Sequence, residues 1–503
     1  MKPLRMTLSA AALALLPLPM AWAQDAARTI SIVPRVSVTE TLTDNVALQG
    51  SNPKSDQITQ VSPGIRINIQ GARLKTYFDY SLNEIYYARG SSSGRQQNAL
   101  NTFGTFEAVD NWAFVDFSGN ISQQAVSAFG TQSTNNTAVN ANQTEVANYR
   151  LSPYIKGRFG SVANYEARIT RAVTSSDSAT ASNTASTNSV VKISNASAFR
   201  SLGWTADASS QQVSYSAGRT TEADVYSLGL TYAVTPQVNV SANAGQESNN
   251  YTSLDKQNYN TSSVGVNWRP SERTTFSAVT GRRSFGNTHN WSFEHRSART
   301  VWRFTDTKDV STTANQSGFG TVGNVYDLFY NQLEGSALTP AERALRVNEL
   351  LQQYGFNANT PVVSSFLTSA VALQRSQNLS FALLGIRDTV TFLLTRTQSN
   401  RLDTFASAID NLSNANTVIQ NGFSINYSHR LTPDYALGLV LSRQATEGST
   451  AAQDTTLKSL NVNLTGKVGK KAAASLGLRH VVSDNAANPY TENSVTGNLN
   501  VQF

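Results

Sequence analysis

The feature that most constrains the fold of this chain is an alternation of apolar and polar residues with a period of two. In the last ten residues, Ser494 to Phe503, every second position is apolar or glycine. Side chains of a β-strand point alternately to its two faces, so this stretch has one apolar face and one polar face. The same pattern recurs along the chain, for example in Val61 to Gln70 and in Tyr226 to Tyr232, and it predicts β-strands throughout.

The connections between these stretches alternate between short and long. Short turns rich in Pro, Gly, Asp and Asn are predicted at 109–111, 234–236, 269–272, 385–388, 431–434 and 466–471. Long tracts rich in Ser, Thr, Asn and Ala lie at 124–143, 175–189, 401–417 and 483–492. Short turns on one rim and long loops on the other are typical of a bacterial outer-membrane barrel, in which the short turns face the periplasm.

We therefore predict an all-β protein, a transmembrane antiparallel up-and-down β-barrel of about 18–22 strands, with 22 the best count. A hydrophobic content of 40% agrees with this fold, because a membrane strand needs only alternate residues to be apolar. The weakest strands in the count lie near Phe103 and Gln211. A series of soluble β-sandwiches is the alternative, but it would need linkers between domains that the sequence does not show.

The first 23 residues have the features of a signal peptide. Lys2 and Arg5 precede an apolar stretch at 8–16, and Ala21-Trp22-Ala23 provides small residues at a cleavage site. We expect residues 24–503 to form the barrel and to be exported to the cell outer membrane. The chain contains no cysteine, which excludes a lipid-modified cysteine and disulfide bonds.

One segment, 306–372, departs from the strand pattern. Residues 325–333 are amphipathic, Thr339 to Glu342 form a capping box with proline at the first helical position, and Gly355 can end a helix. The connection lengths place this helical insert on the long-loop rim. Two interpretations remain open: a lid or plug over the lumen, or an external decoration without a gating role.

Strand parity identifies a set of basic residues that point away from lipid. These candidates for the lumen wall are Arg66, Lys75, Lys156, Arg158, Arg168, Arg269, Arg430 and Arg479. Such a lumen would favour anionic or polyhydroxylated solutes. Several of these residues lie near turns, where contact with periplasmic water or lipid head groups is the alternative.

Enzyme motifs receive little support. Residues 90–94 match the Gly-x-Ser-x-Gly pattern, but they lie in a polar loop rather than at a strand–helix elbow. The four histidines lack the spacing of a metal site. We therefore predict no catalytic residue, no cofactor and no metal. The net charge of +7 is small for this length and has no basic run, so nucleic acid is not an expected partner.

Two blocks of sequence carry a family resemblance. One is Thr41 to Asn45 followed by 62–65, and the other is 268–274 followed by 281–286 and 295–300. The chain resembles the outer-membrane proteins associated with the PEP-CTERM/exosortase system of Gram-negative bacteria. The resemblance implies a barrel encoded beside machinery for exopolysaccharide synthesis and export. Its motifs are turns and strands, and it implies no catalytic residue.

The end of the chain carries a second resemblance. The alternation of Val495, Leu499, Val501 and Phe503 is similar to the signal by which bacterial outer-membrane proteins are recognised for insertion. It implies the barrel-assembly machinery as a partner, beside outer-membrane lipid.

Three hypotheses for function follow. The first is a porin-like pore or conduit linked to exopolysaccharide export, with polysaccharide and periplasmic export components as candidate partners. The second is a non-transporting structural or assembly component of the same envelope system. An outer-membrane enzyme is the least favoured.

Overall fold

The computed structural model describes residues 29–178, 182–199, 201–312, 366–368, 370–403 and 411–503, together with positions 326, 330, 343, 346 and 347. The predicted signal peptide, 1–23, lies outside the described residues. So does most of the predicted insert, including its capping box and Gly355.

The described chain forms 22 strands in one antiparallel sheet. The first eleven are β1 (Thr29–Thr43), β2 (Asp56–Gln70), β3 (Leu74–Tyr87), β4 (Arg95–Val109), β5 (Ala113–Ala125), β6 (Gln143–Phe159), β7 (Ala163–Ser176), β8 (Thr184–Phe199), β9 (Leu202–Tyr215), β10 (Thr221–Thr235) and β11 (Val238–Asn249). The other eleven are β12 (Gln257–Ser271), β13 (Thr274–Arg283), β14 (Gly286–Arg296), β15 (Thr300–Ser311), β16 (Ala372–Leu384), β17 (Asp388–Arg401), β18 (Thr417–Arg430), β19 (Tyr435–Glu447), β20 (Thr455–Lys467), β21 (Ala472–Asn485) and β22 (Tyr490–Gln502).

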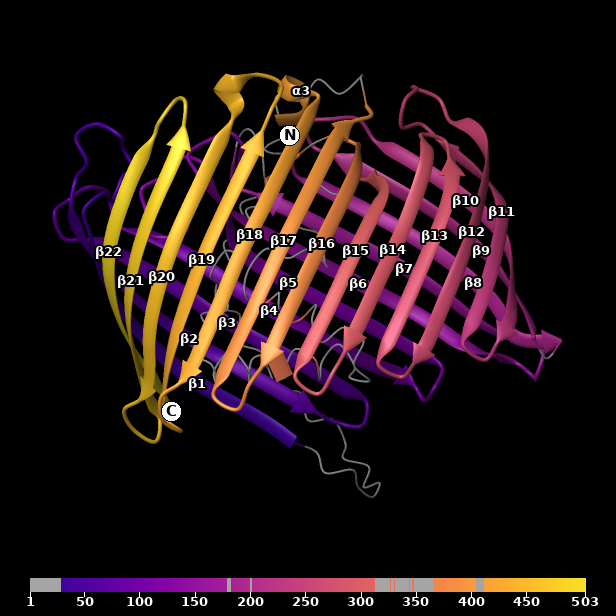
Figure 1. Cartoon of the computed structure of the whole chain (residues 1–503), viewed down its shortest axis with the longest axis horizontal. Coiled ribbons are helices and arrows are strands. Elements are labelled where there is room, and N and C mark those ends of the chain that lie inside the picture. The colour runs from indigo at the N-terminus through magenta and orange to yellow at the C-terminus, as the bar shows by residue number, and fades with distance from the viewer. Residues whose placement is uncertain are drawn as a thin grey trace.

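Each strand pairs with its neighbours in sequence, and β22 returns to pair with β1, which closes the sheet into a barrel (Figure 1). The closing register runs from Arg35 opposite Gln502 to Thr43 opposite Ser494. This arrangement confirms the predicted barrel and its best strand count of 22. The two uncertain strands are real, since Phe103 lies in β4 and Gln211 in β9.

The two faces of the wall differ as the alternation predicts. On β10 the side chains of Tyr226, Leu228, Leu230 and Tyr232 are 50–69% exposed, and the residues between them face the lumen. Leaving such side chains in water would cost roughly 1.5–3 kcal/mol each, whereas bilayer hydrocarbon accommodates them. Val495 and Leu499 of β22 lie on the same outer face, 42% and 45% exposed, opposite Leu42 and Val38 of β1. The barrel is therefore of the outer-membrane type.

The two rims also differ as predicted (Figure 1). All six predicted short turns connect strands on one rim, where β1 begins and Phe503 lies. Two of the short turns on this rim use left-handed backbone, at Asn111 with φ 54° and at Gly160 with φ 55°. The longer connections, including the β5–β6 loop of residues 126–142, lie on the other rim, here called the loop rim.

Helix is a minor component of the described residues. A single turn, α3 (Asn411–Ala415), precedes β18, and a 3₁₀ turn, η1 (Ala451–Gln453), precedes β20. Of the helices within the described ranges, none has the length and apolar character needed to cross a membrane.

The assignment of the two faces can be tested on two residues of β10. We expect Leu230→Arg, at the centre of the exposed apolar stretch from Tyr226 to Val234, to destabilise the barrel by about 2–4 kcal/mol, the cost of a basic residue near the bilayer midplane. Ser227→Arg, on the lumen face, is the matched control and should fold normally. The folded fraction of each variant in lipid vesicles is measured by heat-modifiable gel migration. Equal losses for both variants would contradict the assignment.

Candidate functional site

The β5–β6 loop, residues 126–142, folds inward from the loop rim, and we call it the crossing loop. On the wall next to β5, the second half of the loop accepts two side-chain hydrogen bonds. The Tyr87 hydroxyl donates to the Thr137 carbonyl at 2.8 Å, and the Gln97 amide donates to the Asn136 carbonyl at 2.9 Å. The Val139 amide donates to the Val46 carbonyl at 2.8 Å. These bonds fix the loop against β3, β4 and the loop that follows β1.

The crossing loop then contacts the loop-rim ends of β21 and β22. The Tyr490 hydroxyl donates to the Gln132 carbonyl at 2.5 Å, and the Asn485 side chain donates to the Phe129 carbonyl at 3.0 Å. An apolar cluster accompanies these bonds, formed by Leu48, Ala138, Leu457, Val481 and Tyr490. The loop is therefore attached to the wall on both sides of the β1–β22 closure.

The crossing loop also reaches the opposite side of the barrel. The Ser127 hydroxyl donates to the Asn411 side-chain oxygen of α3 at 2.7 Å. Ala125 and Phe366 form an isolated parallel bridge. Around these contacts lies a buried apolar cluster, which we call the mouth cluster: Ala128, Phe366, Ala372, Leu412, Ala415 and Val418. Since β17 lies about half the barrel's 22 strands away from β5, this cluster joins opposite walls across the mouth.

Local hydrogen bonds explain how so polar a loop keeps one conformation. The Asn135 side chain accepts from the Thr137 amide at 2.9 Å, and Asn140 accepts from the Asn142 amide at 2.9 Å. Asn142 in turn accepts from the Ser127 amide at 2.8 Å. Such side-chain bonds replace the missing strand ladder. A side chain at Gly130 would approach within 2.5 Å of the Asn142 side chain, so a larger residue there would displace Asn142 from its hydrogen bonds to Ser127.

A second set of contacts meets at the same place. The Arg219 guanidinium, in the β9–β10 loop, binds the Asp403 carboxylate at 2.8 Å, and Asp403 is almost fully buried. The Leu402 amide donates to the Val371 carbonyl at 2.9 Å. Tyr251 packs with Ala223 and Val371 in an apolar cluster, and its burial raises the pKa of its hydroxyl above the usual range. Loops from three parts of the rim thus converge on Phe366 and Val371 and on Leu402 and Asp403 at the start of the β17–β18 loop.

The eight predicted lumen residues all lie on strand positions whose parity faces the lumen, opposite the exposed apolar side chains. Three of them are ion-paired. Arg66 binds Asp79 at 2.9 Å, Arg168 binds Asp116 at 2.8 Å, and Arg479 binds Glu492 at 2.8 Å. Asp79 is shared with Arg35, and Arg168 also binds Glu166, so acidic side chains of the inner wall offset most of this positive charge.

The other five predicted lumen residues lie close to the short-turn rim. These are Lys75, Lys156, Arg158, Arg269 and Arg430. The Lys156 ammonium lies 4.5 Å from the centroid of the Phe114 ring, which is a cation–π distance. Sequence reasoning placed all eight on one face, but it did not bring them together at one site.

Part of the inner wall is fully covered. Thr389 and Thr391 on β17, and Ser424, Asn426 and Ser428 on β18, face the lumen and have at most 1% of their surface exposed. Along this side of the wall the lumen is therefore not an open bore.

Single positions of the predicted insert are described. Tyr326 and Tyr330 are helical, and their rings stack with centroids 5.9 Å apart. The Arg343 guanidinium lies 4.8 Å from the Tyr330 ring centroid, and Val347 is buried. The rest of the helices predicted at 325–333 and after Thr339 lies outside the described residues.

The remaining candidates do not form a catalytic or metal site. Residues 90–94 lie in the loop between β3 and β4, without the strand–elbow–helix setting of a nucleophile. Across the ranges that the structure describes, no group of three or more His, Asp or Glu residues could hold a metal ion.

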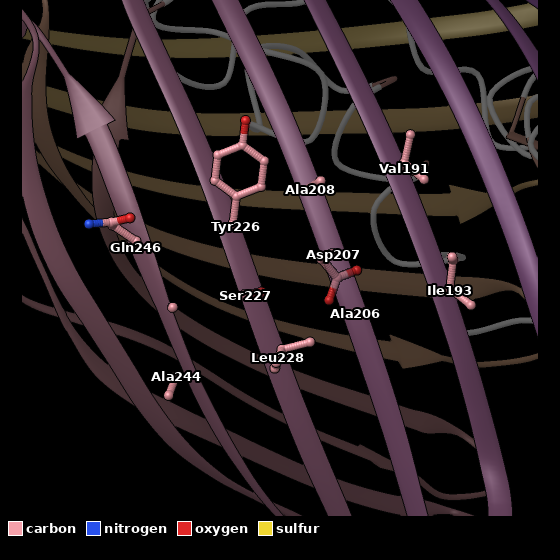
Figure 2. Close-up of a pocket in the computed structure, with 11 residues that line it drawn as sticks. Val191, Ile193, Ala206, Asp207, Ala208, Tyr226, Ser227, Leu228, Ala244 and Gln246 are labelled. Carbon is pink, nitrogen blue, oxygen red and sulfur yellow. The ribbon is translucent and has the colours of Figure 1, made fainter.

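A hollow on the outside of the wall is a separate feature (Figure 2). Its outward side chains are Val191 and Ile193 of β8, Ala206 and Ala208 of β9, and Tyr226 and Leu228 of β10. The small alanines leave space between the larger side chains. Apart from the Tyr226 hydroxyl and the Gln246 amide of β11, the outward side chains of the hollow are apolar, and the hollow faces lipid rather than a soluble substrate.

Comparison with known proteins gives solved structures only, since no family model and no curated protein matches the chain. The siderophore receptor PirA from Acinetobacter baumannii is similar over 93% of this chain and 80% of its own, at 9% identity and a TM-score of 0.47. The FrpB iron transporter from Neisseria meningitidis is similar over 94% and 82%, at 10% identity and a TM-score of 0.49. The copper transporter OprC is similar over 94% and 81%, at 8% identity and a TM-score of 0.44.

The comparison corrects the expected function. The matched structures are described as receptors and transporters for siderophores, iron and copper, so the expectation of a conduit or component linked to exopolysaccharide export is wrong. The physical reason lies in the blocks that carried the resemblance. Residues 41–45 end β1, and 268–274 form the β12–β13 turn. These blocks reflect the strand and turn geometry that any large barrel needs, and they do not indicate which substance a barrel transports.

The mouth cluster can be tested with Leu412→Ala. Leu412 is fully buried, and truncating a buried leucine costs about 2–5 kcal/mol. We expect the substitution to weaken the packing between the crossing loop and α3 and to leave the hydrogen bonds between strands intact. Hydrogen exchange at the backbone amides of 127–139 and 411–415 should accelerate, while the temperature at which the barrel unfolds on gels stays the same.

Leu431→Ala is the matched control, since Leu431 is 44% exposed in a short turn on the other rim. It should leave exchange in both segments unchanged. Unaltered exchange in the crossing loop of Leu412→Ala would contradict the role of the mouth cluster.

Proposed function

We propose that this protein is an outer-membrane transport protein that admits small polar solutes from outside the cell, through a lumen whose outer mouth is closed by its own loops. The observation that carries the proposal is the mouth cluster, in which the crossing loop meets α3 and Phe366 from the opposite wall. The loop rim faces outward if the short turns are periplasmic, as in bacterial barrels. The closure then lies on the side from which an external solute arrives.

The character of the inner wall supports a polar but not strongly charged cargo. A barrel of 22 strands encloses a wide space. The ion pairs of Arg66, Arg168 and Arg479 balance positive charge along the wall. We infer that the lumen accepts hydrophilic solutes without a strong preference for anions, and that the protein is not an enzyme.

The closure is built so that it can open. Phe366 and Leu412 are the large buried side chains of the mouth cluster, and exposing each would cost roughly 1.5–3 kcal/mol. The loops lack the continuous backbone ladder that joins the strands, so they belong to the part of the structure with low local stability. A solute that binds the open arrangement more tightly would shift the population toward it.

The segment between β15 and β16 is proposed to take part in this closure as a lid. Its described C-terminal end supports the idea, because Phe366, Leu367, Ala370 and Val371 are all at most 3% exposed. Val371 also accepts a hydrogen bond from Leu402, in the β17–β18 loop. This end of the segment is therefore fixed within the mouth rather than in solvent.

A reversible cross-link tests the proposed opening. The chain has no cysteine, so Ser127→Cys with Asn411→Cys adds a single pair at a contact where the native side-chain oxygens are 2.7 Å apart. If the mouth must open, the oxidised variant should show few or no open events in planar bilayers and slow entry of a small polar dye into vesicles. A reductant should restore both.

The control is a cross-link that does not span the mouth. Thr41 and Thr496 face each other across the β1–β22 closure with hydroxyl oxygens 3.2 Å apart, and Thr41→Cys with Thr496→Cys should leave conductance unaffected by oxidation. If oxidised and reduced forms of the Ser127–Asn411 pair conduct equally, the mouth does not control passage.

A further inference from the structure

A row of basic side chains lies on the outer face of the barrel, toward the loop rim. Its centre is Arg396 of β17, Arg443 of β19 and Lys458 of β20. Each lies two residues closer to the loop rim than an exposed leucine on the same strand and face. Those leucines are Leu394, Leu441 and Leu460, with exposed fractions of 47%, 40% and 38%. The row therefore follows the loop-rim edge of the apolar, lipid-facing surface. We call it the outer basic row.

The charges of the row form no ion pair in the described structure, although Asp484 of β21, opposite Thr456, lies diagonally across from Lys458. In the part of the chain that the structure describes, no ion pair or side-chain hydrogen bond involves the three central residues, and all three are exposed. Arg443 and Lys458 stand directly opposite each other in the β19–β20 register. Like charges in directly opposed positions destabilise a sheet. An anion between them would remove this cost.

The surroundings of the row show where acidic groups do occur. On one side Arg375 of β16 binds the Asp306 carboxylate at 2.6 Å, with Lys308 of β15 opposite Arg375. Glu447, near the end of β19, accepts from the Asn421 side chain at 3.4 Å. Neither carboxylate forms an ion pair with Arg396, Arg443 or Lys458.

Other parts of the same face have a different charge. On the outer faces of β1 and β3, Glu40 and Glu84 occupy the loop-rim half of the strand, and on β10 Glu222 and Asp224 bind Lys256 at 2.9 and 2.8 Å. Outward basic residues also occur on β7 and β13, as Arg171 and Arg282, but they are opposite uncharged residues, whereas Arg443 and Lys458 are directly opposed.

We propose that the outer basic row binds the phosphate groups of phosphorylated glycolipids in the outer leaflet of the membrane. Guanidinium and ammonium groups bind phosphate oxygens through charge-assisted hydrogen bonds. The row lies along the edge of the lipid-facing band, at the depth of head groups, whereas a soluble anionic partner would meet the loop tips first. Acyl chains would pack on the leucines below while the phosphates meet Arg396, Arg443 and Lys458.

Lipid binding to the purified barrel tests this proposal. The probe is a bisphosphorylated hexa-acyl glycolipid added to the barrel in neutral detergent, with retained lipid counted by native mass spectrometry. At about 1 kcal/mol per basic residue near an anionic surface, Arg443→Gln with Lys458→Gln should weaken binding on the order of tenfold or more. The dephosphorylated glycolipid should bind weakly to both the wild type and this variant.

Arg171→Gln with Arg282→Gln is the matched control, because it removes two outward basic residues from β7 and β13. It should leave the affinity within twofold of the wild type. Equal loss in both double variants, or equal binding of the dephosphorylated glycolipid, would overturn the proposal. So would an excess of inorganic phosphate that competes as well as the phosphorylated lipid does, since the row would then bind free phosphate rather than a lipid. Heat-modifiable migration confirms that each variant is folded.

Discussion

The structure depends on the backbone ladder between β1 and β22. In bilayer hydrocarbon an unpaired backbone N–H or C=O has no water to replace its partner, so an open sheet edge is excluded. The nine register pairs from Arg35–Gln502 to Thr43–Ser494 remove both edges at once. Once the sheet is closed, the alternation of side chains divides the wall into a lipid face and a lumen face. The lengths of the connections then define the two rims.

On the loop rim the polar groups of the backbone also need hydrogen-bond partners, but strand pairing does not supply them. The crossing loop has no strand ladder, yet its polar groups are bound by asparagine, serine and glutamine side chains and by the rims of β3, β4 and β22. Its few apolar residues, such as Ala128 and Ala138, pack at the points where it meets another loop. A polar loop of this kind can close a wide opening and still separate from its partners more easily than the strands do.

The sequence was sufficient for the barrel but not for its mouth. Alternation and turn residues predicted the strands, the short-turn rim and the face on which Arg66 and Arg168 lie, because these properties are local. Their bonds to Asp79 and Asp116 depend on cross-strand register, which parity alone does not define. For the crossing loop, the sequence predicts only a long polar tract at 124–143. Its contacts with Asn411 and Tyr490 join residues far apart in sequence, and no local pattern marks them.

The separation in sequence of the contacts in the mouth has a consequence for the order of assembly. Tyr490 and Gln132 are 358 residues apart, and Asn485 and Phe129 are 356 apart. Bringing together groups so distant along a chain is slow unless other contacts have already placed them side by side. The pairing of β22 with β1 does this, so the mouth forms after the wall closes. A barrel still open along that seam would lack the partners that hold the crossing loop, and a closed mouth therefore reports that assembly of the wall is complete.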